Sequence, residues 1–446
     1  MTKITIVGAG LVGSLQALFL AKRGFEVDVY ERRDDIREQV LQAGKSINLA
    51  LSDRGWKALE RVGVDKVVRD ISIPMHGRRM HDVEGNLTYQ PYGKEGQAIY
   101  SVSRGGLNQL LVKQADLHDK VNFHFNEKCL DIDLDNNEIT FENTQTGTTK
   151  TVKSDYIFGA DGAFSAVRNR MMRTDRFTYS QTYIPHGYKE LLLPANADGT
   201  HKIEKEALHI WPRGEHMLIA LPNLDGSYTC TLFLAFDGGF DQLNSKEEVE
   251  AFFKKQFPDF LELMPNVWEE FQSNPTASLV YINCEPWNHK DKVLLIGDAA
   301  HGIVPFYGQG MNAGFEDCTV FDDLLNEVGQ DNIGEAIAKF SGIRKKDGDA
   351  ICELALYNFI EMRDRVADAE FLLRKKIEAK FSQAHPDKWI PLYSQVTFSH
   401  IPYSEALARG KQQEAIMSRV MDRENIHENW DSSEVMEQIL NEINAL

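Results

Sequence analysis

The chain has 446 residues, 42% of them hydrophobic, which favours two or three lobes with sizeable cores over a disordered chain. Asp and Glu total 67 against 49 Lys and Arg, so the formal net charge of -18 argues against partners such as nucleic acid or an anionic membrane. The cysteines suggest neither a disulfide framework nor a zinc knuckle and fit a reducing cytoplasm, because they are scattered and form no C-x-x-C pair: Cys129, Cys230, Cys284, Cys318 and Cys352.

The N-terminal segment predicts the start of a doubly wound α/β domain. Residues 4–7 and 26–30 have the apolar pattern of strands, and residues 11–23 between them have the pattern of a helix. A strand so near the N-terminus leaves no room for a removable signal peptide, and no apolar run reaches the roughly 20 residues that span a bilayer. We therefore expect no membrane partner.

A G-x-G-x-x-G motif, made by Gly8, Gly10 and Gly13, joins the first strand to the first helix. Glycines permit a tight turn and a close backbone approach to a ligand, and the helix N-terminus favours a pyrophosphate. Glu31, at the end of the next strand, can accept hydrogen bonds from ribose hydroxyls. Glycines at such a turn can serve packing alone, but strand, helix and acid in register favour dinucleotide binding. The loop does not distinguish FAD from NAD.

Two later apolar strands, at residues 156–159 and 293–296, extend the same domain, which is therefore discontinuous. Asp161 follows the first strand, and Asp298 follows the second. An Asp after a buried strand is as often a helix N-cap as a ligand, so neither acid decides the function alone.

The segment GDAAHGIVPFYGQGMNAG has the features of a flavin site. Asp298 can bond a ribityl chain, while Gly308 and Gly310 let the backbone run against an isoalloxazine ring. The amides of Met311 and Asn312 would then open a helix towards that ring. The positive end of such a helix stabilises the negative charge of a reduced flavin.

The remaining segments predict a sheet and a helical region. Residues 77–92 and 183–236 read as antiparallel strands of one substrate-side sheet, and the chain from residue 321 onward reads as amphipathic helices. The last sixteen residues predict a docking helix with Asp431 and Glu434 as a capping box. We expect an FAD-binding domain at 1–72, 98–180 and 285–325, a substrate domain at 73–97 and 181–284, and a C-terminal helical domain at 326–446.

These motifs resemble the kynurenine 3-monooxygenase family of flavoprotein aromatic hydroxylases. IPMHGRRMH, LYNFIEMR and IPLYSQVTFS are the most specific stretches. The resemblance implies an α/β fold with a Rossmann-like FAD-binding domain of the p-hydroxybenzoate hydroxylase type, an antiparallel-sheet substrate domain and a C-terminal helical region. The other matching stretches, which run to about Tyr403 in the family's order, are GAGLVGSLQALFLAKRGFEVDVYERR, GKSINLALSDRG, PYG, SVSRGGLNQLL, YIPHGYKEL, HIWPRG and GDAAHGIVPFYGQGMNAGFEDC.

The resemblance also implies a substrate pocket, with Arg78 and Tyr92 on the substrate's α-carboxylate. Without the resemblance, the structural interpretations would be preferred: Arg78 pairing with Asp82 on a sheet surface, Tyr393 in a core, and Asn358 capping a turn. The full set of implied substrate-binding residues is Arg78, Tyr92, Phe306, Asn358, Glu361, Met362 and Tyr393, with Tyr307 beside Phe306 over the flavin ring.

The cofactor site that the resemblance implies includes several backbone contacts, where the side chain matters little. Arg104 would lie near the pyrophosphate, although a surface arginine is the alternative. Lys45 stands where many relatives have Arg, which could weaken a bidentate contact. We expect no counterpart of the apolar C-terminal membrane anchor that eukaryotic members carry. The implied FAD contacts are Gly8, Gly10, Val12, Gly13, Glu31, Arg32, Arg33, Ala50, Arg104, Cys129, Asp161, Asp298, Met311 and Asn312.

The activity implied by the resemblance is hydroxylation of L-kynurenine to 3-hydroxykynurenine. FAD is the bound cofactor, NADPH and dioxygen are cosubstrates, and a flavin C4a-hydroperoxide transfers the oxygen, so no residue acts as a nucleophile and no metal is implied. We expect a cytoplasmic monomer or homodimer. The alternatives are a hydroxylase of another aromatic acid and a non-catalytic flavin-binding sensor; the sensor would need neither GQGMN nor the pocket residues.

Overall fold

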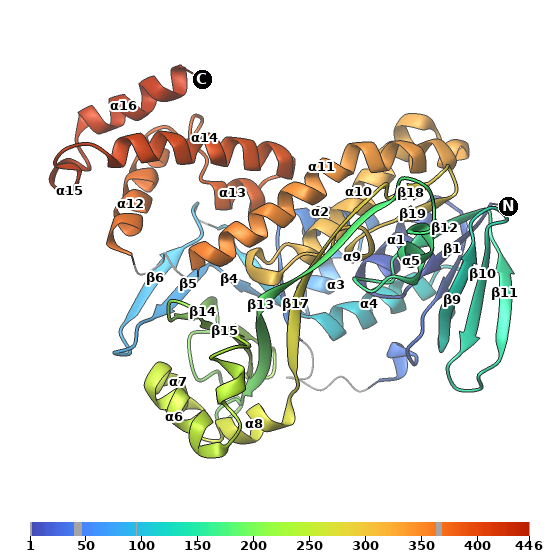
Figure 1. The fold of residues 1–446 in the computed structure, drawn as a ribbon, viewed down its shortest axis with the longest axis horizontal. Coiled ribbons are helices and arrows are strands. Elements are labelled where there is room, and N and C mark those ends of the chain that lie inside the picture. The colour runs from blue at the N-terminus through green and yellow to red at the C-terminus, as the bar shows by residue number, and fades with distance from the viewer. Residues whose placement is uncertain (1, 40–46, 95, 363–367, 446) are drawn as a thin grey trace.

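A computed structural model describes residues 2–39, 47–94, 96–362 and 368–445 of the protein (Figure 1). Lys45, which the sequence singled out, lies outside the described residues. The described chain forms an N-terminal α/β domain, a second domain built on a large sheet, and a group of helices near the C-terminus. This architecture confirms the predicted fold class.

A six-stranded sheet forms the centre of the first domain. All its neighbouring strands are parallel except for the edge pair β18 and β19. Because β1, β12 and β19 are neighbours, their carboxyl ends bring together loops that are far apart in the sequence. In spatial order the strands are β18 (Asn288–His289), β19 (Val293–Leu295), β12 (Tyr156–Gly159), β1 (Lys3–Val7), β2 (Glu26–Tyr30) and β8 (Val121–His124).

Helices and two small sheets complete this domain. Helix α1 packs against α2, α4 and α10. The helices are α1 (Leu11–Lys22), α2 (Asp53–Val62), α3 (Asp65–Arg69), α4 (Arg104–Asp116), α5 (Ala166–Met171), α9 (Asp298–His301) and α10 (Gly310–Val328). The small antiparallel sheets are β3 (Asn48–Leu51), β7 (Ile99–Ser103) and β4 (Ser72–Met75), and β11 (Thr149–Lys153), β10 (Glu138–Asn143) and β9 (Glu127–Asp133). The short 3-10 turns of the described chain are η1 (Ile36–Glu38), η2 (Phe240–Gln242), η3 (Pro305–Tyr307) and η4 (Gln330–Asn332), of which η2 belongs to the second domain.

The second domain is built on a seven-stranded sheet, and its long strands β13 and β17 reach back to the first domain (Figure 1). The sequence predicted only antiparallel strands, but β14 and β5 are parallel. The chain passes through the first domain between β6 and β14, and this long crossover makes a parallel pair possible. The order is β17 (Thr276–Glu285), β13 (Thr178–Leu193), β16 (Tyr228–Ala235), β15 (Met217–Pro222), β14 (Ala207–Pro212), β5 (Gly77–His81) and β6 (Leu87–Pro91).

The two faces of this sheet have different partners. On strand β16, Leu232 packs with Phe253 and Phe260 from the short helices, while its neighbour Phe233 belongs to the cluster around Phe306. Successive side chains of a strand point to opposite faces, so one face forms a closed core and the other is left for a site. The short helices are α6 (Lys246–Gln256), α7 (Pro258–Leu263) and α8 (Val267–Ser273).

The C-terminal helices form a further layer, with α12, α14, α15 and α16 together at the upper left of Figure 1. The last helix docks as predicted, with Val435 and Ile439 buried in a cluster with α14. Its cap is Ser432, whose hydroxyl accepts from the amide of Val435, and not the predicted Asp431. These helices are α11 (Ile333–Ile360), α12 (Ala369–Ala384), α13 (Leu392–Thr397), α14 (Tyr403–Met421), α15 (Ile426–Asn429) and α16 (Ser433–Asn444).

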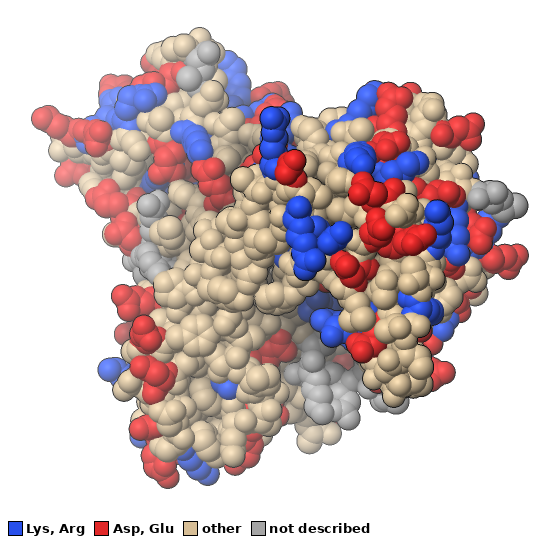
Figure 2. Space-filling model, turned by 45° about the vertical axis from the view of Figure 1, so that its right-hand side comes forward, with Lys and Arg blue, Asp and Glu red and all other residues tan. Residues whose placement is uncertain are grey.

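The surface in Figure 2 mixes acidic and basic side chains, and a wide central area carries few charges. No continuous basic area is visible among the described residues on this face. Within the described parts of the chain, every helix is too short or too polar to cross a lipid bilayer.

Candidate active site

A cavity of about 400 Å³ lies where the first domain meets the open face of the seven-stranded sheet. One end is formed by the loops after β1, β12 and β19, and the other by apolar side chains of the sheet together with Arg78 and Tyr393. The cavity therefore spans both domains.

The three glycines of the first loop are not all required for the same physical reason. A Cβ on Gly8, whose φ is +104°, would lie 2.5 Å from the carbonyl oxygen of Ala160, and a Cβ on Gly13 would lie 2.0 Å from that of Gly8. Both glycines are needed for packing. Gly10 lines the cavity with no described atom within 4 Å of its Cβ position, and it caps α1 without a side-chain hydrogen bond. The N-terminus of α1 is thus open to an anionic ligand.

Glu31 is buried beside this loop, and one of its carboxylate oxygens binds the loop backbone. Its Oε2 accepts from the amide of Ala9 at 2.9 Å, and its Oε1 accepts from the amide and Nε of Arg33 at 3.1 and 2.7 Å. Burial alone would raise the pKa of Glu31, but hydrogen bonds and charge from Arg33 outweigh it and lower the pKa. Glu31 is therefore an ionised acid that shapes the loop, while Arg32 lies exposed.

Asp161 combines the two interpretations that the sequence left open. Its Oδ2 accepts from the amides of Ala166 and Val167 at 2.6 and 3.3 Å, so it caps the start of α5. Its Oδ1 is buried without a hydrogen-bond partner among the described residues, and burial raises the pKa of this carboxyl. Asp298 differs, because it is exposed and lines the cavity directly.

The start of α10 faces the cavity through Gly310 and Met311. The side chain of Asn312 is occupied: its Oδ1 accepts from the amide of Ser52 at 2.9 Å, and its Nδ2 donates to the carbonyl oxygen of Ala50 at 2.9 Å. Its predicted contact can therefore come only from the backbone. Because no side chain caps this helix, its first amides remain available to an acceptor in the cavity.

Three tyrosines surround Arg78 at the other end. Tyr393 stacks between Tyr92 and Tyr307, with ring centroids 5.4 and 5.6 Å apart, and the Arg78 guanidinium lies 4.5 Å from the Tyr393 ring centroid. Nε of Arg78 and Oη of Tyr92 are buried without hydrogen-bond partners among the described residues. Burial raises the pKa of Tyr92 well above its usual value, so its hydroxyl stays protonated. Arg78 lines the cavity, so its cation is left for an anionic group of a ligand, whereas Tyr92 lies behind it and is absent from the wall.

The predicted residues on α11 and beside it do not all reach the cavity. Phe306 and Met362 line it. Asn358 donates from Nδ2 to the carbonyl oxygen of Phe306 at 2.7 Å, so it holds the η3 turn and is absent from the wall. Glu361 lies 3.8 Å from Lys375 and is also absent from the wall.

Some of the remaining predicted cofactor residues line the cavity and others do not. Val12, Ala50 and Arg104 line the cavity, whereas Arg33 and Cys129 do not. Burial raises the pKa of the Cys129 thiol, as expected for an unreactive thiol.

Sequence reasoning missed the apolar wall. Its residues alternate along the strands of the seven-stranded sheet, and that alternation was the signal available. They are Leu208, Met217, Ile219, Leu221, Phe233 and Leu279.

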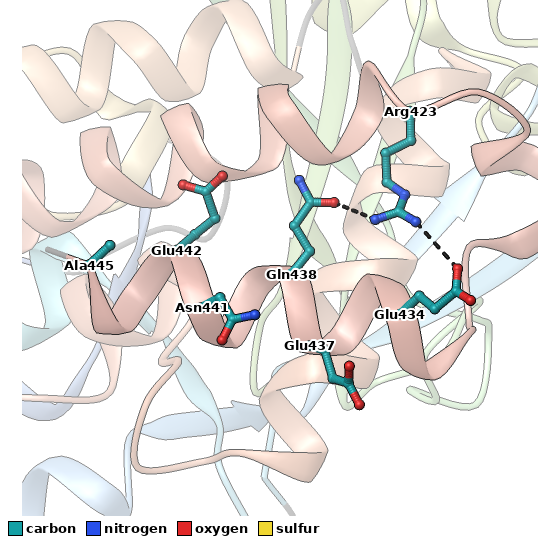
Figure 3. A pocket seen from close by; sticks show the side chains of 7 residues that line it. All are labelled: Arg423, Glu434, Glu437, Gln438, Asn441, Glu442 and Ala445. Atoms are coloured by element: carbon teal, nitrogen blue, oxygen red, sulfur yellow. Dashed lines mark hydrogen bonds and ion pairs between the residues drawn. The ribbon is translucent and has the colours of Figure 1, made fainter.

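A second hollow lies on the C-terminal helices (Figure 3). Arg423 there donates to Oε1 of Gln438 at 2.6 Å and lies 3.6 Å from Glu434. The lining is almost wholly polar and offers no apolar wall for an aromatic ligand. The interdomain cavity is therefore the better candidate. The lining residues of the second hollow are Arg423, Glu434, Glu437, Gln438, Asn441, Glu442 and Ala445.

Comparison with known proteins identifies the family. Residues 1–336 match the family described as FAD binding domain. The chain is 51% identical over 440 residues to a kynurenine 3-monooxygenase of Flavobacterium johnsoniae, covering 98% of each chain. It is 45% identical to the kynurenine 3-monooxygenase of Anopheles gambiae, covering 94% of this chain and 86% of that one.

Solved structures show a related fold at low identity. The structure of 2-methyl-3-hydroxypyridine-5-carboxylic acid oxygenase matches with a TM-score of 0.67 at 20% identity, covering 82% of this chain and 94% of that one. PqsL of P. aeruginosa, solved in complex with 2-aminobenzoylacetate, matches with a TM-score of 0.67 at 18% identity, covering 83% and 99%. These flavoprotein hydroxylase folds agree with the predicted fold class.

Glu190 lies beside the cavity. Tyr188, two residues earlier on the same face of β13, and Thr231, the partner of Glu190 on β16, both line the cavity wall. Burial raises the pKa of Glu190 to about 7, against the opposing charge of Arg104. Between pH 4.5 and about 7 the folded protein therefore keeps a proton on Glu190, whereas the unfolded chain, with its ordinary pKa of 4.5, has released it. The free energy of unfolding falls as the pH rises through this range, and it stays lower above pH 7.

We therefore expect Glu190→Gln to melt at a higher temperature than the parent at pH 8. The difference should shrink as the pH falls towards 4.5, where both side chains are neutral in the folded state. Thermal unfolding across this pH range measures it, with the exposed Glu437→Gln as control. A constant difference at every pH, or none at pH 8, would contradict the assignment.

Proposed function

Because the chain belongs to the kynurenine 3-monooxygenase family, we propose that it hydroxylates L-kynurenine to 3-hydroxykynurenine with bound FAD, NADPH and dioxygen. The observation that carries the proposal is the cavity itself. It joins a dinucleotide loop to Arg78, a half-buried arginine that lines the cavity beside Tyr393 and has no acidic partner among the described residues. No other described hollow combines these features with an apolar wall.

The residues at the first end of the cavity fit FAD. Gly10 leaves open space at the N-terminus of α1, Asp161 has a buried oxygen without a partner, and Asp298 is exposed to the cavity. We assign the pyrophosphate to the α1 loop with Arg104 nearby, the ribityl chain to Asp298, and the flavin ring to the start of α10. When bound, FAD supplies the redox chemistry, taking electrons from NADPH and passing them to dioxygen.

The residues at the other end fit kynurenine. This substrate has a carboxylate at one end and an aromatic amine at the other. Arg78 would donate to the carboxylate, Tyr92 would add a hydroxyl hydrogen bond, and the face of Tyr393 would complete the pocket. The apolar wall, including Phe233, would hold the aromatic ring and exclude water, so that the oxygen goes to the ring.

Other aspects of the proposal concern location and assembly. All five cysteines are free thiols, which supports a reducing compartment, and we propose the cytoplasm. A monomer or a homodimer is proposed. A hydroxylase acting on another aromatic acid is disfavoured, because relatives 49–51% identical over almost the whole chain are named kynurenine 3-monooxygenases.

The direct test is an assay of the purified yellow protein with NADPH. We expect NADPH oxidation to accelerate when kynurenine is added, and the product to be one oxygen heavier, with the hydroxyl next to the amine. Mass spectrometry and NMR identify the product. If kynurenine has no effect while another aromatic acid accelerates oxidation and is hydroxylated, the proposed substrate is wrong.

Glu31→Ala should lower FAD content. The variant removes an acceptor for ribose hydroxyls and also the bonds to Ala9 and Arg33 that shape the loop. Hydrogen bonds to a charged group are worth about 1.5–3 kcal/mol, so FAD affinity should fall by roughly tenfold or more. The ratio of flavin to protein absorbance after dialysis measures this. Glu26→Ala, at the other end of β2, is the control and should retain FAD; equal retention in both would exclude Glu31 from the site.

Arg78→Met should weaken kynurenine binding far more than FAD binding. A desolvated charge pair is worth about 2–5 kcal/mol, which corresponds to at least roughly 30-fold in affinity. Arg78→Lys should recover part of the loss, because it keeps the charge but not the planar fork. Titration of the oxidised flavin spectrum with kynurenine measures the affinity, and anaerobic reduction by NADPH should lose its substrate stimulation in parallel.

The matched control is Arg79→Met, one residue along β5. Arg79 pairs with Glu204 and lies over the Tyr89 ring, away from the cavity. This variant should bind kynurenine like the parent. If Arg78→Met also binds kynurenine and is reduced like the parent, the carboxylate site lies elsewhere.

A further inference from the structure

Arg54, in the first turn of α2, has its side chain fully buried at a junction of three segments. Its Nε donates to the carbonyl oxygen of Val396 at 3.0 Å, and its other nitrogens donate to the carbonyl oxygen of Ile401 and to Glu316. The guanidinium also lies 3.9 Å from the ring centroid of Tyr403. One side chain thus joins α2, α10 and the segment from α13 to α14.

The backbone next to Arg54 contacts the loop proposed to face the flavin. The amide of Ser52 donates to Oδ1 of Asn312 at 2.9 Å, and its hydroxyl lies 3.4 Å from Nε2 of Gln309. Oε1 of Gln309 in turn accepts from the hydroxyl of Tyr403 at 3.0 Å. The start of α2 is therefore fixed to the flavin loop on one side and to the C-terminal segment on the other.

The segment that Arg54 holds carries Tyr393. Helix α13 is only six residues long, and Arg54 binds two of its last carbonyls, Val396 and, at 3.5 Å, Gln395. A helix this short gains little stability by itself, so its position depends on tertiary contacts. The ring of Tyr393, three residues before Val396, is the one stacked between Tyr92 and Tyr307.

We propose that Arg54 is a positioning residue for the hydroxylation. It fixes the end of α13 against α2 and thereby holds Tyr393 beside Arg78, at a fixed position relative to the flavin loop. This inference rests on the proposed function. Arg54 does not line the cavity, so it acts only through the residues that it holds. A displacement of about 1 Å at a site of this kind can cost up to about 100-fold in rate, so the effect should be measurable.

The expected defect is specific. With α13 loosened, kynurenine should bind more weakly and water should enter the pocket. More NADPH would then be consumed without hydroxylation, with NADPH, a proton and dioxygen giving NADP+ and hydrogen peroxide. FAD content should stay close to that of the control, because Arg54 contacts none of the proposed cofactor residues.

The experiment compares Arg54→Met and Arg54→Lys with Arg61→Met. Arg61 lies on the same helix and binds α10 through the Thr319 carbonyl oxygen and Asp322, both at 3.3 Å, but makes no contact with α13. Arg61→Met therefore removes a contact between α2 and α10 without removing one with α13. For each variant we would measure kcat, KM for kynurenine, product formed per NADPH, FAD content, and amide hydrogen exchange of residues 392–401.

Arg54→Met should raise KM at least about tenfold and lower product per NADPH, with faster exchange in residues 392–401. Arg54→Lys should be intermediate, because an ammonium keeps the charge for Glu316 but cannot bind the carbonyls of Val396 and Ile401 together. Arg61→Met should match the parent in KM and exchange.

The proposal is overturned if Arg54→Met keeps the parent's KM and coupling, if its exchange in residues 392–401 is unchanged, or if Arg61→Met shifts equally. Should Arg54→Met not fold, Arg54→Lys decides, and parental behaviour in that variant would refute the role. If the parent itself does not hydroxylate kynurenine, the proposed function fails. Amide hydrogen exchange of residues 392–401 does not depend on turnover, so it still tests whether Arg54 holds α13.

Discussion

Close packing at a few glycines governs the site, because three distant segments meet there without room for side chains. A Cβ on Gly8 would lie 2.5 Å from the carbonyl oxygen of Ala160, and a Cβ on Gly314 would lie 2.5 Å from Cγ2 of Val12. A Cβ on Gly297 would lie 2.9 Å from Cγ2 of the same valine. These contacts join the loops after β1, β12 and β19 at one edge of the sheet. Since interiors of this density resist displacement, the cofactor end is shaped before any ligand binds.

The different partners of Arg344, which is buried, and Arg78, which is half-buried, indicate different roles. Arg344 lies within 2.7 Å of both Glu316 and Asp317, so its charge is neutralised inside the protein. Arg78 faces tyrosine rings, and no carboxylate lies within ion-pair distance of it among the described residues. A partly desolvated cation without an acid beside it is costly unless a ligand supplies the negative charge. Arg78 is therefore suited to binding, and Arg344 to holding α10 and α11 together.

The sequence predicted what local pattern can encode. Strand, turn and helix at Gly8 to Gly13 are set by neighbouring residues, and so were predictable. The pairing of β5 with β14 is long-range, so periodicity could not predict the parallel pair; alternation along the strands could mark the apolar residues, but not the cavity that they line together. Arg54 has the sequence context of a surface helix residue, and only the fold shows it to be buried. Asn358 donates to the carbonyl oxygen of Phe306, a long-range contact that its sequence motif does not encode.

The two ends of the cavity come from different parts of the chain, and this separates their chemistry. The cofactor end uses residues up to about Asn312, whereas the aromatic stack beside Arg78 is completed by Tyr393 from α13. Losses at the cofactor end should therefore remove flavin, while losses at the far end should leave flavin bound and the substrate poorly held. The start of α2 contacts both ends, through Ser52 on Asn312 and Arg54 on the α13 backbone. If the ligands bind as proposed, the alignment of substrate with flavin depends on this contact region around Arg54, which does not itself line the cavity.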